Sequence, residues 1–310
     1  MKARHLALAV VALLVLAVPP LLTAMGADYY VSTAGRIVVF AIAATSLNLV
    51  LGYGGMVSFG HAAFVGLGAY ATGVMISEGH PDAFANLALT LAISAGAALV
   101  IGAISLRTRG VYFIMITLAF GQMLFYLANS IKGYGGDEGL NIRARSALFG
   151  LDLKDPTTFY YVALAVLAAT LLALAAFVRS RPGRALVATR DDEQRAEALG
   201  FATYRLRLAV FVAAGAVAGI AGALSVNQQG YVSPSLMQWT HSGTLMVMVI
   251  LGGVASIWGG VLGAAVLVVA EDTLASYTTY WAFWTGWMLL IVVLFARRGL
   301  AGALDRAWRR

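Results

Sequence analysis

Charged residues are absent from six long intervals of the chain, and these intervals carry the main signal of its fold. A helix that crosses a bilayer needs about 20 apolar residues, so each interval has room for at least one span. Backbone groups in hydrocarbon must pair internally, which leaves helices or a closed barrel. Barrel strands are about 10 residues long and alternate between polar and apolar residues. The charge-free intervals are longer than that and do not alternate. The intervals without Asp, Glu, Lys or Arg are 37–77, 83–106, 110–131, 156–178, 208–270 and 273–296.

The pattern predicts an all-α polytopic membrane protein with about ten transmembrane helices, and eight to ten spans are compatible with the interval lengths. The segment 242–271 holds either one long span or a broken pair, and we predict the pair. The predicted spans lie near 5–26, 35–52, 58–77, 86–106, 110–131, 158–178, 207–226, 242–255, 257–271 and 281–297.

The composition agrees with a lipid environment. Apolar residues make up 61% of the chain and charged residues 11%, whereas about a quarter of a soluble domain is charged. We therefore interpret residues 1–310 as a single transmembrane domain. The absence of Cys excludes disulfides, thiolate metal sites and a Cys nucleophile. Residues 1–27 also fit a cleaved signal peptide, because basic residues precede an apolar run and small residues follow it.

The distribution of Lys and Arg predicts the orientation. With the amino terminus inside, 16 of the 21 basic residues fall in the cytoplasm and 5 fall outside. The opposite orientation would contradict the positive-inside rule. We therefore expect both termini and the connections 107–109 and 179–206 to lie in the cytoplasm.

Two glycine-rich stretches are predicted to break helices inside the membrane, near 52–60 and 252–260. Residues 51–60 read Leu-Gly-Tyr-Gly-Gly-Met-Val-Ser-Phe-Gly, and residues 251–257 read Leu-Gly-Gly-Val-Ala-Ser-Ile. Paired interruptions of this kind in the two halves of a transporter point to the substrate pathway. The alternative is that the glycines only allow close helix packing.

The cytoplasmic connection 179–206 is the most informative polar segment. Asp191 can cap a helix over 191–199, Gln194 completes a capping box, and Arg195 lies at i+4 from Asp191. Gly200 is a helix stop. A helix this short needs a packing partner. The segment is therefore either a docking helix for a cytosolic protein or a solvated loop whose arginines fix the topology.

The order of motifs along the chain resembles branched-chain amino acid ABC permeases of the LivM type. The matching stretches are Leu47–Leu49, Gly60–Phe64, Gly66–Tyr70, Gly135-Gly136 with Gly139-Leu140, Gly183–Ala185, Arg190–Glu193, Ala196–Gly200 and Leu251-Gly252-Gly253 to Trp258-Gly259. The resemblance implies that 184–200 docks an ATPase subunit. The docking residues that it implies are Arg184, Arg190, Asp191, Glu193, Arg195, Glu197, Ala198 and Gly200.

The resemblance also implies the partners and the location. We expect a second permease subunit, identical or different, two cytosolic ATPase subunits that use ATP and Mg, and a periplasmic substrate-binding protein. The largest outer loop, 132–157, either helps to receive that binding protein or is only solvated. The chain is expected in the bacterial inner membrane among lipid, with no nucleic-acid partner and no cofactor of its own. The implied cargo is leucine, isoleucine and valine, with urea, amides or another small organic solute as alternatives.

Missing motifs limit what the chain does alone. Gly-Lys occurs nowhere, so no phosphate-binding loop of the Walker A type can be written. No acidic residue lies in the interior of a predicted span, whereas ion-coupled pumps usually keep carboxylates there. The four His residues at 5, 61, 80 and 241 form no catalytic or metal-binding cluster. We therefore expect a transporter subunit and not an enzyme, with a stand-alone channel as the alternative of another class.

A few polar side chains lie in otherwise apolar spans. An amide or hydroxyl in lipid is costly unless it is paired, so each should face another helix or a cavity. Interhelical hydrogen bonding and contact with substrate are both open for all of them. The candidates for the substrate pathway are Asn48, Ser58, His61 and Gln122, with Thr117 and Asn129 as further polar positions.

Overall fold

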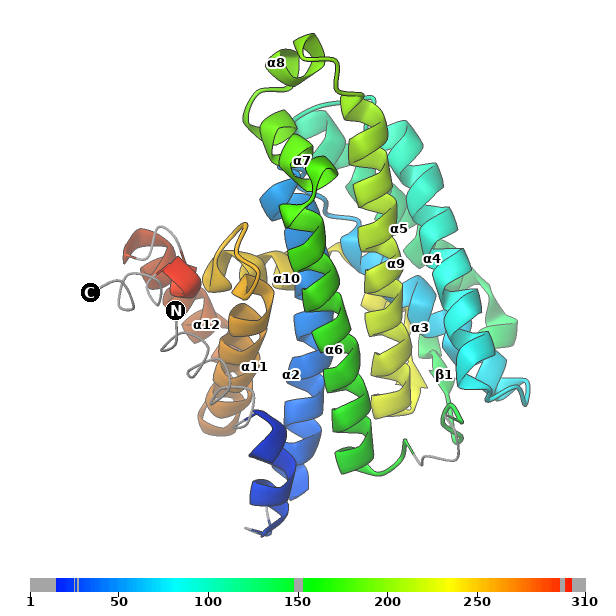
Figure 1. Cartoon of the computed structure of the whole chain (residues 1–310). Coiled ribbons are helices and arrows are strands. Elements are labelled where there is room, and N and C mark those ends of the chain that lie inside the picture. The colour runs from blue at the N-terminus through cyan, green and yellow to red at the C-terminus, as the bar shows by residue number, and fades with distance from the viewer. Residues whose placement is uncertain (1–14, 25, 27, 148–152, 296–298, 303–310) are drawn as a thin grey trace.

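The computed structural model describes residues 15–24, 26, 28–147, 153–295 and 299–302, and it shows an almost entirely helical protein (Figure 1). The major helices are α2 (Asp28–Asn48), α3 (His61–Ser77), α4 (Ala83–Ser105), α5 (Val111–Ser130), α6 (Pro156–Arg179), α7 (Arg181–Asp191), α8 (Glu193–Ala198), α9 (Thr203–Gln229), α10 (Trp239–Gly252), α11 (Gly259–Tyr277) and α12 (Trp281–Phe295). The short elements are the π-helical turn η1 (Leu49–Tyr53), the 3-10 turns η2 (Lys132–Tyr134), η3 (Gly136–Glu138) and η4 (Pro234–Met237), and the strands β1 (Leu140–Asn141) and β2 (Tyr231–Val232).

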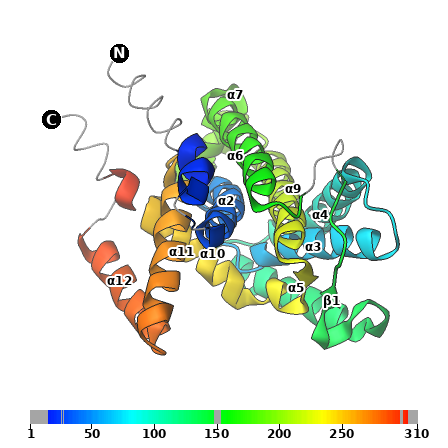
Figure 2. The ribbon, with the colours of Figure 1, turned by 90° about the horizontal axis from the view of Figure 1, so that it is seen from below.

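Helices α2 and α9 form the centre of the bundle. Helix α9 packs against α3 and α4, and α2 packs against α6, α9 and α11. Figure 2 shows α11 and α12 on one side of α2, with α3 and α4 on the other. A Cβ added at Gly68 would lie 2.1 Å from the Gly219 carbonyl oxygen, and one at Gly222 would lie 1.9 Å from the Val65 carbonyl oxygen. Glycine therefore brings α3 and α9 into backbone contact, as small residues commonly do in membrane bundles.

The predicted fold class is confirmed. Among the described residues, six helices are long and apolar enough to cross a membrane, and four shorter helices are also apolar. Each of these ten helices overlaps one predicted span. The part of the first span before Val15, and the proposed signal-peptide region that contains it, lie outside the described residues. The six long segments are Tyr29–Tyr53, Ala83–Ser105, Val111–Ser130, Pro156–Arg179, Thr203–Gln229 and Gly259–Tyr277, and the shorter ones are Val15–Ala24, His61–Ser77, Trp239–Gly252 and Trp281–Val292.

Both predicted helix breaks are present. We call residues 54–60 the first break: there the chain leaves η1 and runs without regular structure until α3 begins. We call residues 253–258 the second break, which separates α10 from α11. The structure therefore confirms the predicted pair of short helices in 242–271 and excludes the alternative, one long span.

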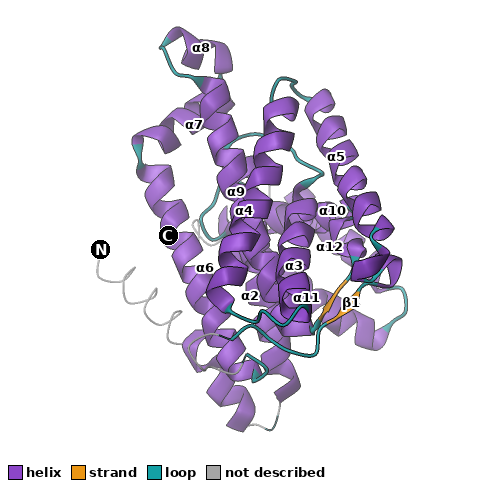
Figure 3. Cartoon of the chain, turned by 90° about the vertical axis from the view of Figure 1, so that its right-hand side faces the viewer, coloured by secondary structure: helices purple, strands orange, loops and turns teal. Residues whose placement is uncertain are grey.

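The connections alternate between two ends of the molecule (Figures 1 and 3). Helices α7 and α8 lie at one end, where Arg109 forms an ion pair with Glu193. The antiparallel pair of β1 and β2 lies at the other end, where an isolated bridge also joins Asp82 to Ala147. The two polar connections that we predicted for the cytoplasm thus share one end.

One expectation about charge in the spans is wrong. Helix α11 continues past residue 271 to Tyr277, so Glu271 and Asp272 lie within it. Asp272 forms an ion pair with Arg36 of α2, and both side chains are about one-third exposed. A charge in a membrane segment is costly unless it is paired. The Asp272 carboxylate therefore stabilises the basic residue of α2 and ties α2 to α11.

Candidate functional site

The segment between α6 and α9 folds into two helices and not into one. Ser180 caps α7, and its Oγ accepts a hydrogen bond from the Gly183 N–H at 3.3 Å. Pro182 lies in the first turn of α7, where a missing N–H costs nothing. Helix α7 was not predicted, because Pro182 and Gly183 together suggest only a break.

Asp192 caps α8, and its carboxylate accepts a hydrogen bond from the Arg195 N–H at 3.0 Å. A helix is present within the predicted range 191–199, but its cap is Asp192 and not Asp191, because α7 runs to Asp191. The predicted pair of Asp191 with Arg195 is also replaced, since Arg195 lies 3.4 Å from the Asp192 carboxylate. Gly200 has a φ of +86° just after α8, as expected of a helix stop.

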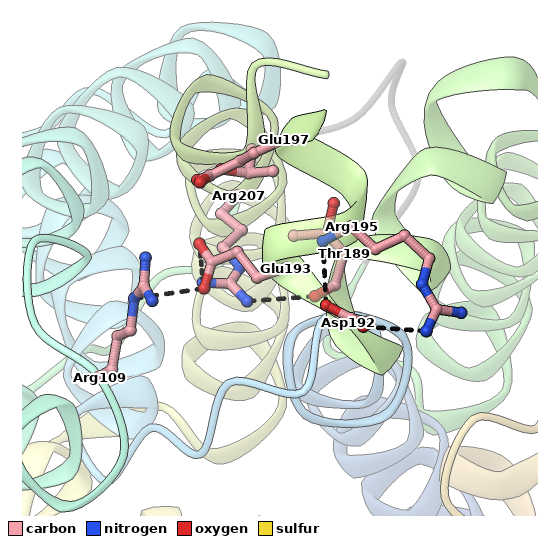
Figure 4. A network of polar contacts seen from close by, with 8 residues as sticks. Arg109, Thr189, Asp192, Glu193, Arg195, Glu197 and Arg207 are labelled. Atoms are coloured by element: carbon pink, nitrogen blue, oxygen red, sulfur yellow. Dashed lines mark hydrogen bonds and ion pairs between the residues drawn. The ribbon is translucent and has the colours of Figure 1, made fainter. Parts of the chain in front are cut away.

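Glu193 is the centre of a polar network that holds α8 against the bundle (Figure 4). Arg207 of α9 donates to Glu193 Oε1 at 2.8 Å, and Arg109 lies 3.3 Å from Oε2. A second guanidinium nitrogen of Arg207 donates to the Thr189 carbonyl oxygen of α7 at 3.5 Å. The side chains of Glu193 and Arg207 are each only 16% exposed. Partly buried charge-assisted bonds are stronger than surface pairs, so this network fixes the segment in place.

Most of the other predicted docking residues are exposed. These are Arg184, Arg195, Ala198 and Gly200. Glu197 is also at the surface, but its carboxylate accepts a hydrogen bond from Thr203 Oγ1 at 2.8 Å. Together with Glu193, it helps to hold α8 on α9.

An apolar pair at the tip of this segment was not among the predicted site residues. Leu199 is 72% exposed and Phe201 is 44% exposed, on either side of Gly200. Adjacent exposed apolar side chains in a charged segment are typical of a protein contact. The signal in the sequence is an apolar residue on each side of the helix stop, in a segment that is otherwise rich in charge.

Arg190 points from α7 into the bundle. One guanidinium nitrogen donates to the Gly52 carbonyl oxygen at 2.8 Å, and two others hold the Asp191 carboxylate at 3.0 and 2.8 Å. Its aliphatic stem lies against Gly55, since a Cβ added there would be 2.6 Å from Arg190 Cγ. The docking segment therefore contacts the first break directly.

Asn48, the last residue of α2, holds the backbone of the second break. Its Nδ2 donates to the Ser256 carbonyl oxygen at 2.6 Å, and its Oδ1 accepts from the Ala255 N–H at 3.0 Å. The residue is fully buried. Both ends of its amide are thus engaged by the backbone of the second break.

The remaining candidates for the substrate pathway lie on α3, α5 and the first break. His61 begins α3 and lies fully buried, with its Nε2 2.8 Å from Ser46 Oγ. Ser58 is also buried in the first break, whereas Gln122 lies half-buried on α5. Among the described residues, Ser58 Oγ, His61 Nδ1 and Gln122 Nε2 have no hydrogen-bond partner. Thr117 bonds only the Ile114 carbonyl oxygen of its own helix, and Asn129 is half-buried.

No group of three or more His, Cys, Asp or Glu residues that could hold a metal ion occurs in the described part of the chain. A bundle of ten apolar helices, two interrupted connections within it and a folded polar segment at one end together define a polytopic membrane protein. A match to a known family shows which kind of membrane protein this is. Residues 29–296 match the family described as "Branched-chain amino acid transport system / permease component", and the chain belongs to this family.

Several relatives are similar over long stretches. The chain is 29% identical to the LivM permease protein of the high-affinity branched-chain amino acid transport system of Salmonella typhimurium, over 93% of this chain and 73% of LivM. It is 33% identical to the LivH permease protein of the same system, over 47% of this chain and 48% of LivH. It is 31% identical to the autoinducer 2 import system permease protein LsrC of Salmonella paratyphi B, over 90% of this chain and 80% of LsrC.

The solved structure described as "PsaBC from Streptococcus pneumoniae in complex with Fab" contains a chain that is 16% identical, with a TM-score of 0.47 over 87% of this chain and 91% of that one. Membership of the family makes this chain the non-catalytic transmembrane component of an ABC transporter. ATP is used by partner ATPase subunits and not by this chain, and the family works with a substrate-binding protein.

Proposed function

We propose that this protein imports the branched-chain amino acids leucine, isoleucine and valine across the bacterial inner membrane, as one permease subunit of an ABC transporter. The observation that carries this proposal is the similarity to LivM over 93% of the chain. Both termini and the α7–α8 segment lie in the cytoplasm, which is supported by the excess of basic residues on that side.

The α7–α8 segment is the docking site for an ATPase subunit. Its two caps and the network around Glu193 give it a fixed shape, and Leu199 and Phe201 offer apolar surface at its tip. Arg184 and Arg195 are exposed on the same segment and add positive charge to it. In this arrangement, the apolar pair supplies affinity and the exposed charges supply orientation.

The transport cycle follows from this docking. A periplasmic binding protein delivers the amino acid to the outer end, which carries the loop 132–157. ATP-driven dimerisation of the ATPase subunits moves α7 and α8, and the cavity between the permeases changes from outward-facing to inward-facing. A second permease completes the pathway, and the partial similarity to LivH supports a partner of that kind.

Another small organic solute is the second candidate for the cargo. The similarity to LsrC, a permease protein of an autoinducer 2 import system, covers 90% of this chain. The family architecture therefore serves more than one solute, and urea and amides belong to the same set of alternatives. A stand-alone channel is the alternative of another class, and it leaves the docking segment without a role.

The test is uptake of labelled leucine and labelled urea by cells with and without this gene, with unlabelled isoleucine and valine as competitors. Loss of leucine uptake that both competitors inhibit supports the proposal. Loss of urea uptake alone assigns a different cargo, and transport that persists after ATP depletion indicates a channel. The double variant Leu199→Ser and Phe201→Ser should abolish both uptake and copurification of the ATPase, while the chain still reaches the membrane.

A further inference from the structure

Arg190 occupies an unusual position for a residue of a docking surface. Its three guanidinium nitrogens are committed to the Gly52 carbonyl oxygen and to Asp191, and its side chain is only 32% exposed. Two of these nitrogens, Nε and Nη2, donate to the same Asp191 oxygen, Oδ1, and this pair of contacts orients the guanidinium group. The remaining nitrogen is thereby aimed at the last turn before the first break.

The carbonyl group that Arg190 reaches lies where the helical hydrogen-bond pattern has already changed. Two N–H groups of the first break bond back to η1: the Gly54 N–H bonds the Leu49 carbonyl oxygen at 3.1 Å, and the Met56 N–H bonds that of Val50 at 3.0 Å. Local π-helical geometry of this kind is frequent at functional sites. A side chain that holds such a turn controls a part of the backbone that has more than one way to pair.

The same turn touches the second break. A Cβ added at Gly52 would lie 2.3 Å from Asn48 Oδ1 and 2.5 Å from the Ala255 nitrogen. Ala255 has a φ of +58°, and it is the one non-glycine residue with positive φ in the described part of the chain. Strained residues persist only where their surroundings hold them, and here Asn48 holds Ala255 through its N–H.

We infer that Arg190, Gly52 and Asn48 form a mechanical relay that couples movement of α7 to both helix breaks. This inference rests on the proposed function, because it takes α7–α8 as the segment that the ATPase moves. Arg190 acts in it as a positioning residue and not as a docking contact. Displacement of α7 pulls on the Gly52 carbonyl group, and the Asn48 amide passes the shift to Ala255 and Ser256.

The relay has a simple physical basis. Continuous helices are stiff, whereas the two breaks are the points at which the bundle can change shape without losing a full helical ladder. Each step of the relay is a short polar contact in a partly buried place, where hydrogen bonds are stronger than at an open surface. Together the two steps join segments that lie more than 200 residues apart in the sequence, Asn48 and Ser256 being separated by 208.

The test compares Arg190→Met with Arg181→Met. Both variants remove one positive charge from α7, but Arg181 makes no hydrogen bond or ion pair in the described part of the chain. The chain has no Cys, so a single cysteine at Val254, a 48% exposed residue of the second break, reports on that break alone. The complex is purified through a tag on this chain and placed in nanodiscs. The rate at which a maleimide–polyethylene glycol probe modifies residue 254 is read as a gel shift, with and without a non-hydrolysable ATP analogue.

The chain with an intact relay should show a nucleotide-dependent change in the labelling rate of the cysteine at position 254. The Arg181→Met variant should show the same change. Arg190→Met should lose this change and lower leucine uptake about tenfold, which is the loss of one charge-assisted hydrogen bond, while the ATPase still copurifies. Arg190→Lys keeps one donor and should retain part of the response. Should the Met variant not accumulate in the membrane, Arg190→Gln, whose side chain is too short to reach Gly52, carries the same test.

Three results would overturn the relay, each in a distinguishable way. If Arg190→Met keeps both the nucleotide response and the uptake, the contact with Gly52 transmits nothing. If it loses the copurifying ATPase, Arg190 is a docking contact, and the proposed function stands without the relay. If no ATPase copurifies with the unaltered chain, the proposed function fails and the relay fails with it.

Discussion

The two helix breaks begin from similar glycine-rich sequence but are held in different ways. Most of the first break is buried, and it lies under Arg190 of the docking segment. The second break is partly exposed, with Val254 and Trp258 at 48% and 46%, and the side chain that holds its backbone is Asn48. The difference shows that glycine determines where a helix stops, whereas a distant polar side chain determines how the interrupted backbone is held.

The largest effect is expected where η1, the turn before the first break, touches the second break. Gly52→Ala places a Cβ 2.5 Å from the Ala255 nitrogen, so η1 and the second break must separate, and the free energy of unfolding should fall by about 3 kcal/mol. The measurement is unfolding of the purified chain in mixed micelles with increasing SDS. Gly96→Ala, at a helical position where nothing lies within 4 Å, is the control, and it should be neutral or slightly stabilising. An equal loss in both variants would show that the contact at Gly52 is not specific.

Removal of the Asn48 amide should affect the second break more than the first. Asn48→Leu leaves the Ala255 N–H unpaired. It also removes one of the two hydrogen bonds to the Ser256 carbonyl oxygen, which still accepts from the Gly259 N–H. Together these losses should cost about 2 kcal/mol. Thr117→Val is the matched control, because Thr117 Oγ1 bonds only a carbonyl group of its own helix. Cysteine labelling at residue 254 should become faster in the Asn48 variant and stay unchanged in the control. Unchanged labelling in both would argue against Asn48 as the support of the second break.

The positive-φ positions of the two breaks should respond in opposite directions. Gly55→Ala puts a side chain at a φ of +67° and against Arg190 Cγ, and it should destabilise the chain by about 1–2 kcal/mol. Ala255→Gly relieves the same kind of strain at a φ of +58° and should raise stability slightly. The same SDS titration compares the two variants. Two changes of equal sign would mean that backbone strain does not distinguish the breaks.

The smallest expected effect is that of low pH on the breaks, because neither break contains a carboxylate that could be protonated. The pH dependence of stability should come from carboxylates elsewhere in the chain. Hydrogen bonds from the Thr158 side chain and backbone hold the pKa of the Asp155 carboxyl group below its usual value at the start of α6. A lowered folded-state pKa gives stability above the unfolded pKa of about 4, and this stability is lost as pH falls through the folded pKa. Asp155→Ala should therefore cost about 1 kcal/mol at pH 7 and nothing at strongly acidic pH.

The pH dependence of unfolding provides the check. Asn48→Leu should keep the slope that the unaltered chain shows between pH 5 and pH 3, an interval of about the carboxyl titration range, whereas Asp155→Ala should flatten it. A change of slope in the Asn48 variant would place a titrating group at the breaks.

The sequence predicts the spans and both breaks well, because charge and glycine are visible along one dimension. It also indicates that an amide at Asn48 needs a partner, since a buried amide is costly when unpaired. It does not reveal that the partners are Ala255 and Ser256, because that pairing depends on how α2 meets the second break. The direction of a long side chain is equally hidden, so Arg190 was predicted only as a docking residue, and its hydrogen bond to the Gly52 carbonyl oxygen was not foreseen.

The docking segment shows the limit of local rules. Two neighbouring aspartates can each cap a helix, and only the backbone geometry selects Asp192 over Asp191. Pro182 breaks one helix but also starts the next, which is why α7 was missed. The docking role of the predicted residues, the pathway role of the polar ones and the orientation of the chain stay predictions.

The ion pair between Arg36 and Asp272 sets a condition on how the protein is made. The two residues are separated by 236 positions, so the ribosome finishes α2 long before it reaches the acid that neutralises it. During that interval the nascent chain carries a guanidinium group in a membrane segment without its ion-pair partner, which is costly in lipid. Chains truncated before α11 should therefore be unstable biogenesis intermediates, and synthesis of α11 is the step that commits α2 to its final place.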